Sequence, residues 1–220
     1  MKKKILACLL ILFPIFSLGL VKADTEKTKY VIASDSSFAP FVFQDSRNQY
    51  TGIDMDLIKA IAKDQGFEIE ITNPGFDAAI NAVQSGQADG VIAGMSVTDA
   101  RKETFDFSDS YYTANTILGV KESSTISSYE DLNGKTVGVK NGTASQSFLT
   151  ENQSKYGYKI KTFSDAASMY DSLNTGSIDA VMDDEPVIKY SISQGQKLKT
   201  PIAGTPIGET AFAVKKGSNP

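Results

Sequence analysis

Short apolar strands alternate with helical segments along this chain, and this alternation constrains the fold more than any other feature. The strands are apolar or alternating runs, whereas the helices have apolar residues at helical spacing and end at a glycine. In the first half we predict strands and helices in turn over residues 30–33, 53–65, 67–71, 76–85 and 88–94. Strands separated by helices form a mostly parallel sheet with helices on its faces, so the fold class is α/β.

The second half repeats this order. We predict strands and helices in turn over residues 135–140, 143–152, 158–163, 164–175, 178–183 and 186–195, the last helix starting at Pro186. A weak internal repeat aligns "SGQADGVIAG" with "TGSIDAVMDD" and pairs Gly94 with Asp184. Two α/β lobes are therefore expected. The repeat indicates a common lobe topology, although similar helix–glycine–strand units also arise by chance.

The first 23 residues are typical of a secretory signal peptide. Three lysines precede an apolar run from Ile5 to Val21, and small residues lead to a cleavage site after Ala23. A retained membrane anchor is the alternative, but Pro14 interrupts the run, which is shorter than the roughly 20 residues of a membrane span. Cys8, the single cysteine, lies in this segment, so we expect no thiol, disulfide or lipid in the mature chain.

Charge and composition exclude several functions. Four of the 22 basic residues and none of the 26 acidic residues lie in residues 1–23, so the remainder has a net charge of −8, which argues against binding of nucleic acid or anionic membranes. The chain has no histidine and, after cleavage, no cysteine, which excludes Ser-His and Cys-His nucleophiles and zinc sites built on His or Cys. Carboxylate catalysis and hard-metal binding remain open, but no cofactor or metal is expected.

The stretch "AGMSVTDAR" places polar groups just after an apolar strand. Ser96 offers a hydroxyl, Thr98 is a plausible N-cap, and Arg101 presents a guanidinium. A helix N-terminus, a hydroxyl and a guanidinium together suit a carboxylate. The alternative is that Thr98 only caps the helix and that Arg101 pairs at the surface with Asp99 or Asp106.

Five segments together resemble one protein family. They are "ASDSSFAPFVFQD", "YTGIDMDLIKAIAK", "GFDAAINAVQSGQADGVIAGMSVTDARKETFDFSDSYY", "LNGKTVGVKNGTASQSFL" and "IDAVMDDEP". In order, from about Tyr30 to Lys216, they resemble the polar amino-acid branch of the bacterial solute-binding proteins of ABC transporters. The resemblance implies a type II periplasmic-binding-protein-like fold, with two lobes joined by two strands and an L-amino acid held in the cleft between them.

The resemblance also implies which residues bind the ligand. Arg101 would bind the α-carboxylate, with help from Ser96 and from the loop at Thr143 and Ala144. Ala144 departs from the family pattern because it offers only a backbone N–H, and Ser96 is smaller than the usual threonine. Neither departure changes the expectation of an amino-acid ligand.

The α-ammonium group would be bound by Asp184 and by the carbonyl of Gly94, and Phe38 and Phe76 would flank the ligand side chain. A zwitterion needs one fixed cation, one fixed anion and neutral donors and acceptors, which these residues supply at loop positions. The alternatives are core packing for the two phenylalanines and a solvated helix start for the acidic run 183–185.

Asp35 and Lys140 match the family positions that read the far end of the ligand side chain. A cationic side chain would meet Lys140 and an anionic one Asp35, whereas a carboxamide can donate to Asp35 and accept from Lys140. We therefore expect glutamine first, then asparagine or histidine. A Lys140 that faces solvent would reopen the cationic amino acids.

The expected organisation is a signal peptide over 1–23, a first lobe over 28–113, a second lobe over 114–207, and a return to the first lobe over 208–220. Hinges are expected at Tyr111–Asn115 and Thr205–Thr210. The family normally continues past "AFAVKKGSNP", so we expect a truncated sequence. The product would be a monomeric binding domain at the extracellular face of the membrane, serving an ABC permease to which it could be fused.

Two rival functions remain. An enzyme on the same fold, such as a cyclohexadienyl dehydratase, would use a carboxylate for proton transfer, and a sensory domain would bind the same ligand. Other motifs fail: "NGKT" lacks the first glycine of a phosphate loop, because Tyr129 occupies that position, and "DMD" lacks the rest of a calcium loop.

Overall fold

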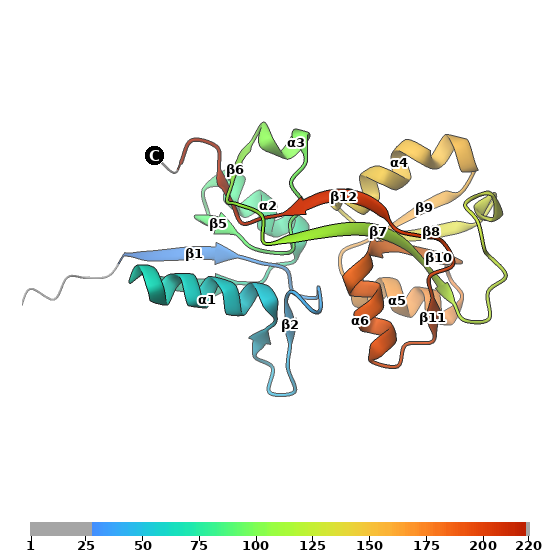
Figure 1. Ribbon diagram of the computed structural model, residues 1–220, viewed down its shortest axis with the longest axis horizontal. Helices are drawn as coiled ribbons and strands as arrows, with labels where there is room; N and C mark the ends of the chain where they lie inside the picture. The colour runs from blue at the N-terminus through green and yellow to red at the C-terminus, as the bar shows by residue number, and fades with distance from the viewer. Residues whose placement is uncertain (1–27, 219–220) are drawn as a thin grey trace, which may run out of the picture.

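The computed structural model describes residues 28–218, which form two α/β units side by side (Figure 1). The predicted signal peptide lies outside the described residues. Each unit contains a sheet with helices on both faces, and two long strands pass between the units. The predicted fold class, an α/β protein with two lobes, is confirmed.

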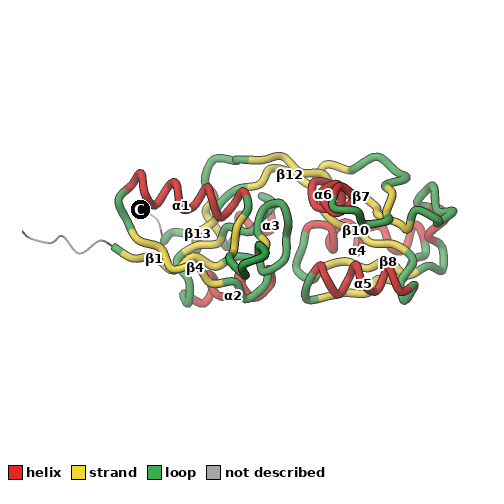
Figure 2. The backbone as a smooth tube through the Cα atoms, turned by 90° about the horizontal axis from the view of Figure 1, so that it is seen from below, coloured by secondary structure: helices red, strands yellow, loops and turns green. Residues whose placement is uncertain are grey.

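The first sheet has the strand order β4-β1-β5-β13-β6. The three parallel strands are β1 (Lys29–Ala33), β4 (Glu68–Thr72) and β5 (Gly90–Val91), and the antiparallel edge is formed by β13 (Ala213–Lys215) and β6 (Phe105–Phe107). The helices α1 (Ile53–Gln65) and α2 (Phe76–Ser85) lie on opposite sides of this sheet (Figure 2). A short hairpin, β2 (Phe43–Gln44) and β3 (Tyr50–Thr51), precedes α1, and the single turn α3 (Asp99–Lys102) follows β5.

One predicted strand is much shorter than expected. The apolar run 88–94 is buried except at Asp89, but only Gly90 and Val91 form a strand. The neighbouring strand β1 ends at Ala33, whose carbonyl accepts a last hydrogen bond from the N–H of Ile92 at 3.1 Å. Beyond that point the pairing with β1 ends, so the rest of the run forms a buried loop.

The second sheet has the order β11-β7-β10-β8-β9, and β12 also pairs with β7. The strands β8 (Thr136–Lys140), β9 (Lys159–Phe163) and β10 (Ala180–Asp184) are parallel, whereas β7 (Tyr112–Lys121), β11 (Leu198–Lys199) and β12 (Thr205–Thr210) run antiparallel to their neighbours. The helices of this unit are α4 (Ala144–Tyr156), α5 (Ala166–Thr175), α6 (Glu185–Ser193) and the 3-10 turn η1 (Glu130–Leu132).

The two units share one topology, as the internal repeat predicts. The order β4-β1-β5 followed by antiparallel β13 corresponds to β9-β8-β10 followed by antiparallel β7. The aspartate of each repeat has the same role: Asp89 accepts a hydrogen bond from the N–H of Val31 at 2.7 Å, and Asp179 accepts one from the N–H of Thr136 at 2.8 Å. The Asp89 carboxylate thereby links the start of β5 to β1, and the Asp179 carboxylate links the start of β10 to β8.

The strand β12 pairs along its length with the first half of β7, from Tyr112 and Thr210 to Thr116 and Thr205. They form a two-stranded connection between the units (Figure 1). Both predicted hinge segments therefore lie on this connection. Among residues 28–218 there is no helix with the length and apolar character that crossing a membrane requires.

Candidate ligand-binding site

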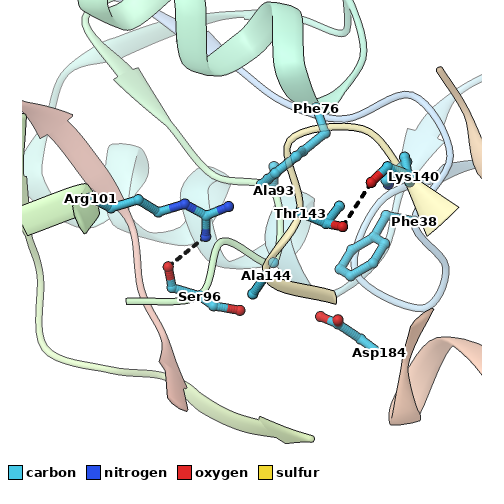
Figure 3. A pocket seen from close by; sticks show the side chains of 10 residues that line it. Phe38, Phe76, Ala93, Ser96, Arg101, Lys140, Thr143, Ala144 and Asp184 are labelled. Atoms are coloured by element: carbon cyan, nitrogen blue, oxygen red, sulfur yellow. Dashed lines mark hydrogen bonds between the residues drawn. The ribbon is translucent and has the colours of Figure 1, made fainter. Parts of the chain in front are cut away.

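A pocket lies between the two units at the carboxyl ends of their parallel strands. About 260 Å³ of empty space, including its open mouth, is lined by Phe38, Phe76, Ala93, Gly94, Ser96, Arg101, Lys140, Thr143, Ala144 and Asp184 (Figure 3). Nine of the ten predicted ligand-binding residues are in this lining. Asp35 is not in the lining, although it pairs with Lys140, which is, and Ala93 was not predicted.

Arg101 reaches the pocket from α3. The Thr98 hydroxyl caps this turn by accepting a hydrogen bond from the N–H of Arg101 at 3.3 Å. The guanidinium donates to the carbonyl of Ser96 at 2.7 Å and, across the cleft, to the carbonyl of Gly142 at 3.0 Å. It also lies 5.3 Å from the centroid of the Phe76 ring.

These contacts exclude the surface alternative for Arg101. Asp99 pairs instead with Lys102 at 3.2 Å, and Asp106 pairs with Lys216 at 3.4 Å. Burial lowers the pKa of the Arg101 guanidinium to about 10, and Asp184 opposes this shift. The side chain therefore remains a cation at neutral pH, with its charge facing a partly dry pocket.

The N-terminus of α4 faces the same pocket. The Thr143 hydroxyl accepts a hydrogen bond from the N–H of Gln146 at 3.1 Å and donates to the carbonyl of Lys140 at 2.8 Å. Because this hydroxyl is used by the cap, the groups of this loop that suit an anion are the N–H groups of the first helical turn, among them that of Ala144.

Asp184 ends β10 and is 7% exposed, so it is not part of a solvated helix start. The Ser145 hydroxyl donates a hydrogen bond to its carboxylate at 3.2 Å. Burial, followed by the charge of Asp183, raises the pKa of Asp184 to about 7. Within the acidic run 183–185, only Glu185 is partly exposed, and it pairs with Lys189 on the next turn of α6.

Asp183 points to the opposite face of β10, and we did not predict a role for it. Its carboxylate accepts hydrogen bonds from the hydroxyl of Tyr170 at 3.0 Å and from the N–H of Asp184 at 2.9 Å. Burial raises the pKa of Asp183. The sequence signal was present, because adjacent strand residues face opposite sides and the second aspartate of a buried strand needs partners of its own.

Lys140 and Asp35 form an ion pair across the cleft. Their side chains are 3% and 1% exposed, and the Lys140 ammonium lies 4.5 Å from the centroid of the Phe38 ring. Asp35 also accepts a hydrogen bond from the N–H of Ser36 at 2.7 Å. Lys140 therefore points into the cleft and not to solvent, and its ammonium is paired with the Asp35 carboxylate.

Asp54, a second residue without a predicted role, holds the backbone at Gly94. Its carboxylate accepts hydrogen bonds from the N–H of Gly94 at 2.6 Å and from the hydroxyl of Tyr111 at 2.9 Å. Burial raises the pKa of Asp54 to about 6. This carboxylate therefore links the pocket to the residue that precedes β7.

Phe38 and Phe76 each line the pocket and each belong to a buried cluster, so both pack in the core, and their contact with a ligand side chain stays a prediction. A side chain at Gly94, where φ is +57°, would overlap the Phe38 ring, so this glycine allows the ring to lie against the backbone. Within residues 28–218, the acidic side chains form no group of three that could hold a metal ion.

Two similar α/β units, joined by paired strands and enclosing a polar pocket, define a two-lobed binding protein. The family model of the bacterial extracellular solute-binding proteins, family 3, matches residues 30–153. The chain belongs to this family.

Relatives of known function extend the match. The arginine-binding extracellular protein ArtP of Bacillus subtilis (strain 168) is 32% identical over 199 residues, which cover 89% of this chain and 78% of ArtP. The histidine-binding periplasmic protein of Escherichia coli (strain K12) is 31% identical over 155 residues, or 70% of this chain and 60% of that protein. The match thus spans between 60% and 78% of the length of these relatives.

Solved structures give a consistent result. The second substrate-binding domain of a putative amino acid ABC transporter from Streptococcus pneumoniae Canada MDR_19A is 90% identical, with 87% of each chain covered and a TM-score of 0.59. Substrate-binding domain 2 of Lactococcus lactis GlnP, in an open conformation, is 57% identical, with 89% of this chain and 84% of that chain covered and a TM-score of 0.60.

An ancestral arginine-binding protein bound to arginine is only 37% identical, with 87% of this chain and 86% of that chain covered, yet its TM-score is 0.81. The more identical open structure superposes less well. This contrast indicates that the lobes of the present chain have the relative arrangement of a ligand-bound protein.

Proposed function

We propose that the chain is the substrate-binding protein or domain of an ABC importer and captures a polar L-amino acid by closure of its two lobes. The observation that carries this proposal is the position of Arg101 and Asp184. A partly buried cation from one lobe and a buried carboxylate from the other line the same pocket. This is the charge pattern of an amino-acid zwitterion.

Each charged group of the ligand then has a defined partner. Arg101, Ser96 and the N-terminal turn at Thr143 and Ala144 bind the α-carboxylate. Asp184 binds the α-ammonium. Because the pKa of this carboxyl is otherwise raised to about 7, the bound cation favours its ionised form.

The carbonyl of Gly94 accepts from the same ammonium, and Phe38 and Phe76 pack against the ligand side chain. Since Gly94 and both phenylalanines come from the first lobe whereas Asp184 comes from the second, the ligand contacts both lobes. Its binding therefore favours the closed arrangement.

Glutamine is the proposed ligand. Its side-chain carbonyl can accept a hydrogen bond from Lys140, whose charge Asp35 already balances, so a neutral carboxamide can bind beside this ion pair without adding net charge to a buried site. An arginine ligand would place its cation beside Lys140, where repulsion in a poorly hydrated cleft is costly. An ancestral arginine-binding protein, 36% identical to this chain, has been solved with glutamine bound, which supports glutamine as a ligand that this fold can hold.

The proposed lobes are residues 28–113 with the return at 208–220, and residues 114–207. Closure is a hinge motion about β7 and β12 near Tyr111–Asn115 and Thr205–Thr210. The closed form is the one delivered to a permease at the extracellular face of the membrane. Small-angle scattering should show a smaller radius of gyration with ligand than without it.

Binding rather than catalysis is proposed because the relatives described above are named as binding proteins. The test is to incubate the protein with an equimolar mixture of the common L-amino acids, remove the unbound fraction, and analyse the retained and free fractions by mass spectrometry. We expect one polar amino acid to be retained and released unchanged. A new product would show an enzyme, and retention of nothing would overturn the proposed function.

A further inference from the structure

Residues 38–43, here called the aromatic loop, connect the pocket to the hinge. Phe38 lines the pocket and stacks on Phe41, with ring centroids 5.4 Å apart and an angle of 22° between the planes. Phe41 in turn packs edge-on against Tyr112, the first residue of β7, at 5.2 Å. Two adjoining ring contacts therefore lead from the pocket to the strand that joins the lobes.

The same loop contacts the opposite lobe outside the pocket. Phe43 lies 5.9 Å from Tyr190 of α6, centroid to centroid. Val187, also of α6 and 3% exposed, belongs to a buried cluster whose other members come from the first lobe: Ile32, Phe38, Phe41, Val42, Met55, Ile58 and Ile92. Val187 and Tyr190 are three residues apart and therefore share one face of α6. Neither residue is in the pocket lining.

The aromatic loop is fixed to its own lobe. The carbonyls of Pro40 and Phe41 accept hydrogen bonds from the N–H groups of Ile53 at 3.1 Å and Asp54 at 2.9 Å, at the start of α1. Gly52 permits this approach, because its φ is +120° and any side chain there would overlap the Phe41 carbonyl. Since the loop is anchored in this way, its contact with α6 depends on how the two lobes are placed.

We propose that the contact of Val187 and Tyr190 with the aromatic loop is a closure contact, which sets ligand affinity without touching the ligand. The inference rests on the proposed function. When only the closed form holds ligand tightly, the apparent affinity scales with the fraction of protein that is closed. An apolar contact made on closure raises that fraction for every ligand equally. It therefore changes affinity and leaves the order of preferred ligands unchanged.

The test is a double-mutant cycle of Phe43→Ala and Tyr190→Ala, with dissociation constants measured for glutamine and asparagine. We expect each single variant to raise the dissociation constant about two- to tenfold, and the double variant to raise it by less than the product of the two. The control is Tyr156→Ala, which removes a ring pair with Tyr129 at 5.2 Å inside one lobe and should leave affinity within about twofold. Wild-type affinity in both single variants, or a changed ligand order, would overturn the proposal.

A second readout needs no ligand. Dyes placed on cysteines substituted for the exposed residues Lys63 of α1 and Glu151 of α4 report the distance between lobes by energy transfer. Without ligand, Tyr190→Ala should shift the distribution toward the open form, whereas Tyr156→Ala should not. If the wild type binds no amino acid, the proposed function fails, but this comparison still decides whether the contact favours closure; identical distributions would overturn it.

Discussion

Lys140 of one lobe and Asp35 of the other form a buried ion pair beside the pocket, and this pair is the main reason to expect a neutral ligand side chain. It closes the far end of the site with one cation and one anion whose charges already cancel. Removal of one partner leaves a buried charge without compensation, a loss worth about 3–5 kcal/mol.

We predict that Lys140→Leu weakens glutamine binding and improves arginine binding relative to glutamine. The substitution removes the donor to the ligand carbonyl and leaves Asp35 as an unpaired carboxylate able to attract a cation. Competition titrations of both ligands against wild type and variant measure this ratio. An unchanged ratio would show that Lys140 does not read the ligand side chain.

Arg101→Ala is predicted to nearly abolish amino-acid binding while the fold remains intact. The ligand carboxylate would lose its cation in a desolvated cleft, which costs about 2–5 kcal/mol, or roughly 30- to several-thousand-fold in affinity. Titration calorimetry on variant protein whose circular dichroism matches the wild type measures the loss. Wild-type affinity would remove Arg101 from the carboxylate site.

Gly94→Ala is predicted to reduce affinity more than tenfold, with Gly86→Ala as the matched control. Both glycines have positive φ, +57° and +76°, so each substitution introduces backbone strain of roughly 1 kcal/mol. Only at Gly94 would the new methyl group also overlap the Phe38 ring, whereas the space at Gly86 is open. Thermal unfolding should show the larger loss of stability for Gly94→Ala, and calorimetry a loss of affinity for Gly94→Ala alone.

The pKa of Asp184, raised to about 7 by burial and by Asp183, predicts two opposite pH dependences. The ammonium of the ligand requires the ionised carboxylate, so affinity should rise with pH through about pH 7 and then level off. The stability of the ligand-free fold should fall over the same range, because the folded state retains a proton that the unfolded chain has released near pH 4.

The variant Asp184→Asn separates these effects. It should bind ligand poorly at every pH and lose part of the decrease in stability between about pH 4 and pH 8. Asp54, whose pKa is raised to about 6, and Asp183, whose pKa is also raised by burial, account for a decrease that remains. Affinity independent of pH in the wild type would contradict the role of Asp184 as the ammonium ligand.

Sequence pattern was sufficient where local geometry decides the structure. Gly66, Gly86 and Gly176 end their helices in the left-handed conformation that glycine adopts most easily, so the helix boundaries were predictable. The internal repeat also predicted one topology for both lobes, because its conserved spacing of glycine and aspartate reflects one local tie between strands.

What was missed depends on contacts distant in sequence. The strand expected over 88–94 stops at Val91 because its partner β1 ends, which the run itself cannot reveal. Asp54 and Asp183 acquire their roles from Gly94, Tyr111 and Tyr170, which the fold brings to them. The family resemblance pointed to the pocket residues, but the pairing of Asp35 with Lys140 required the structure.

The central claim is most directly tested by calorimetric titration of the wild-type protein with each of the common L-amino acids at pH 7.5. The account predicts saturable binding of glutamine with the highest affinity. Asparagine, one methylene shorter, should bind more weakly by roughly 1–3 kcal/mol, and arginine and lysine should bind weakest among the polar ligands. Strong binding of arginine with little response to glutamine would contradict the assigned specificity, and no binding of any amino acid would contradict the account as a whole.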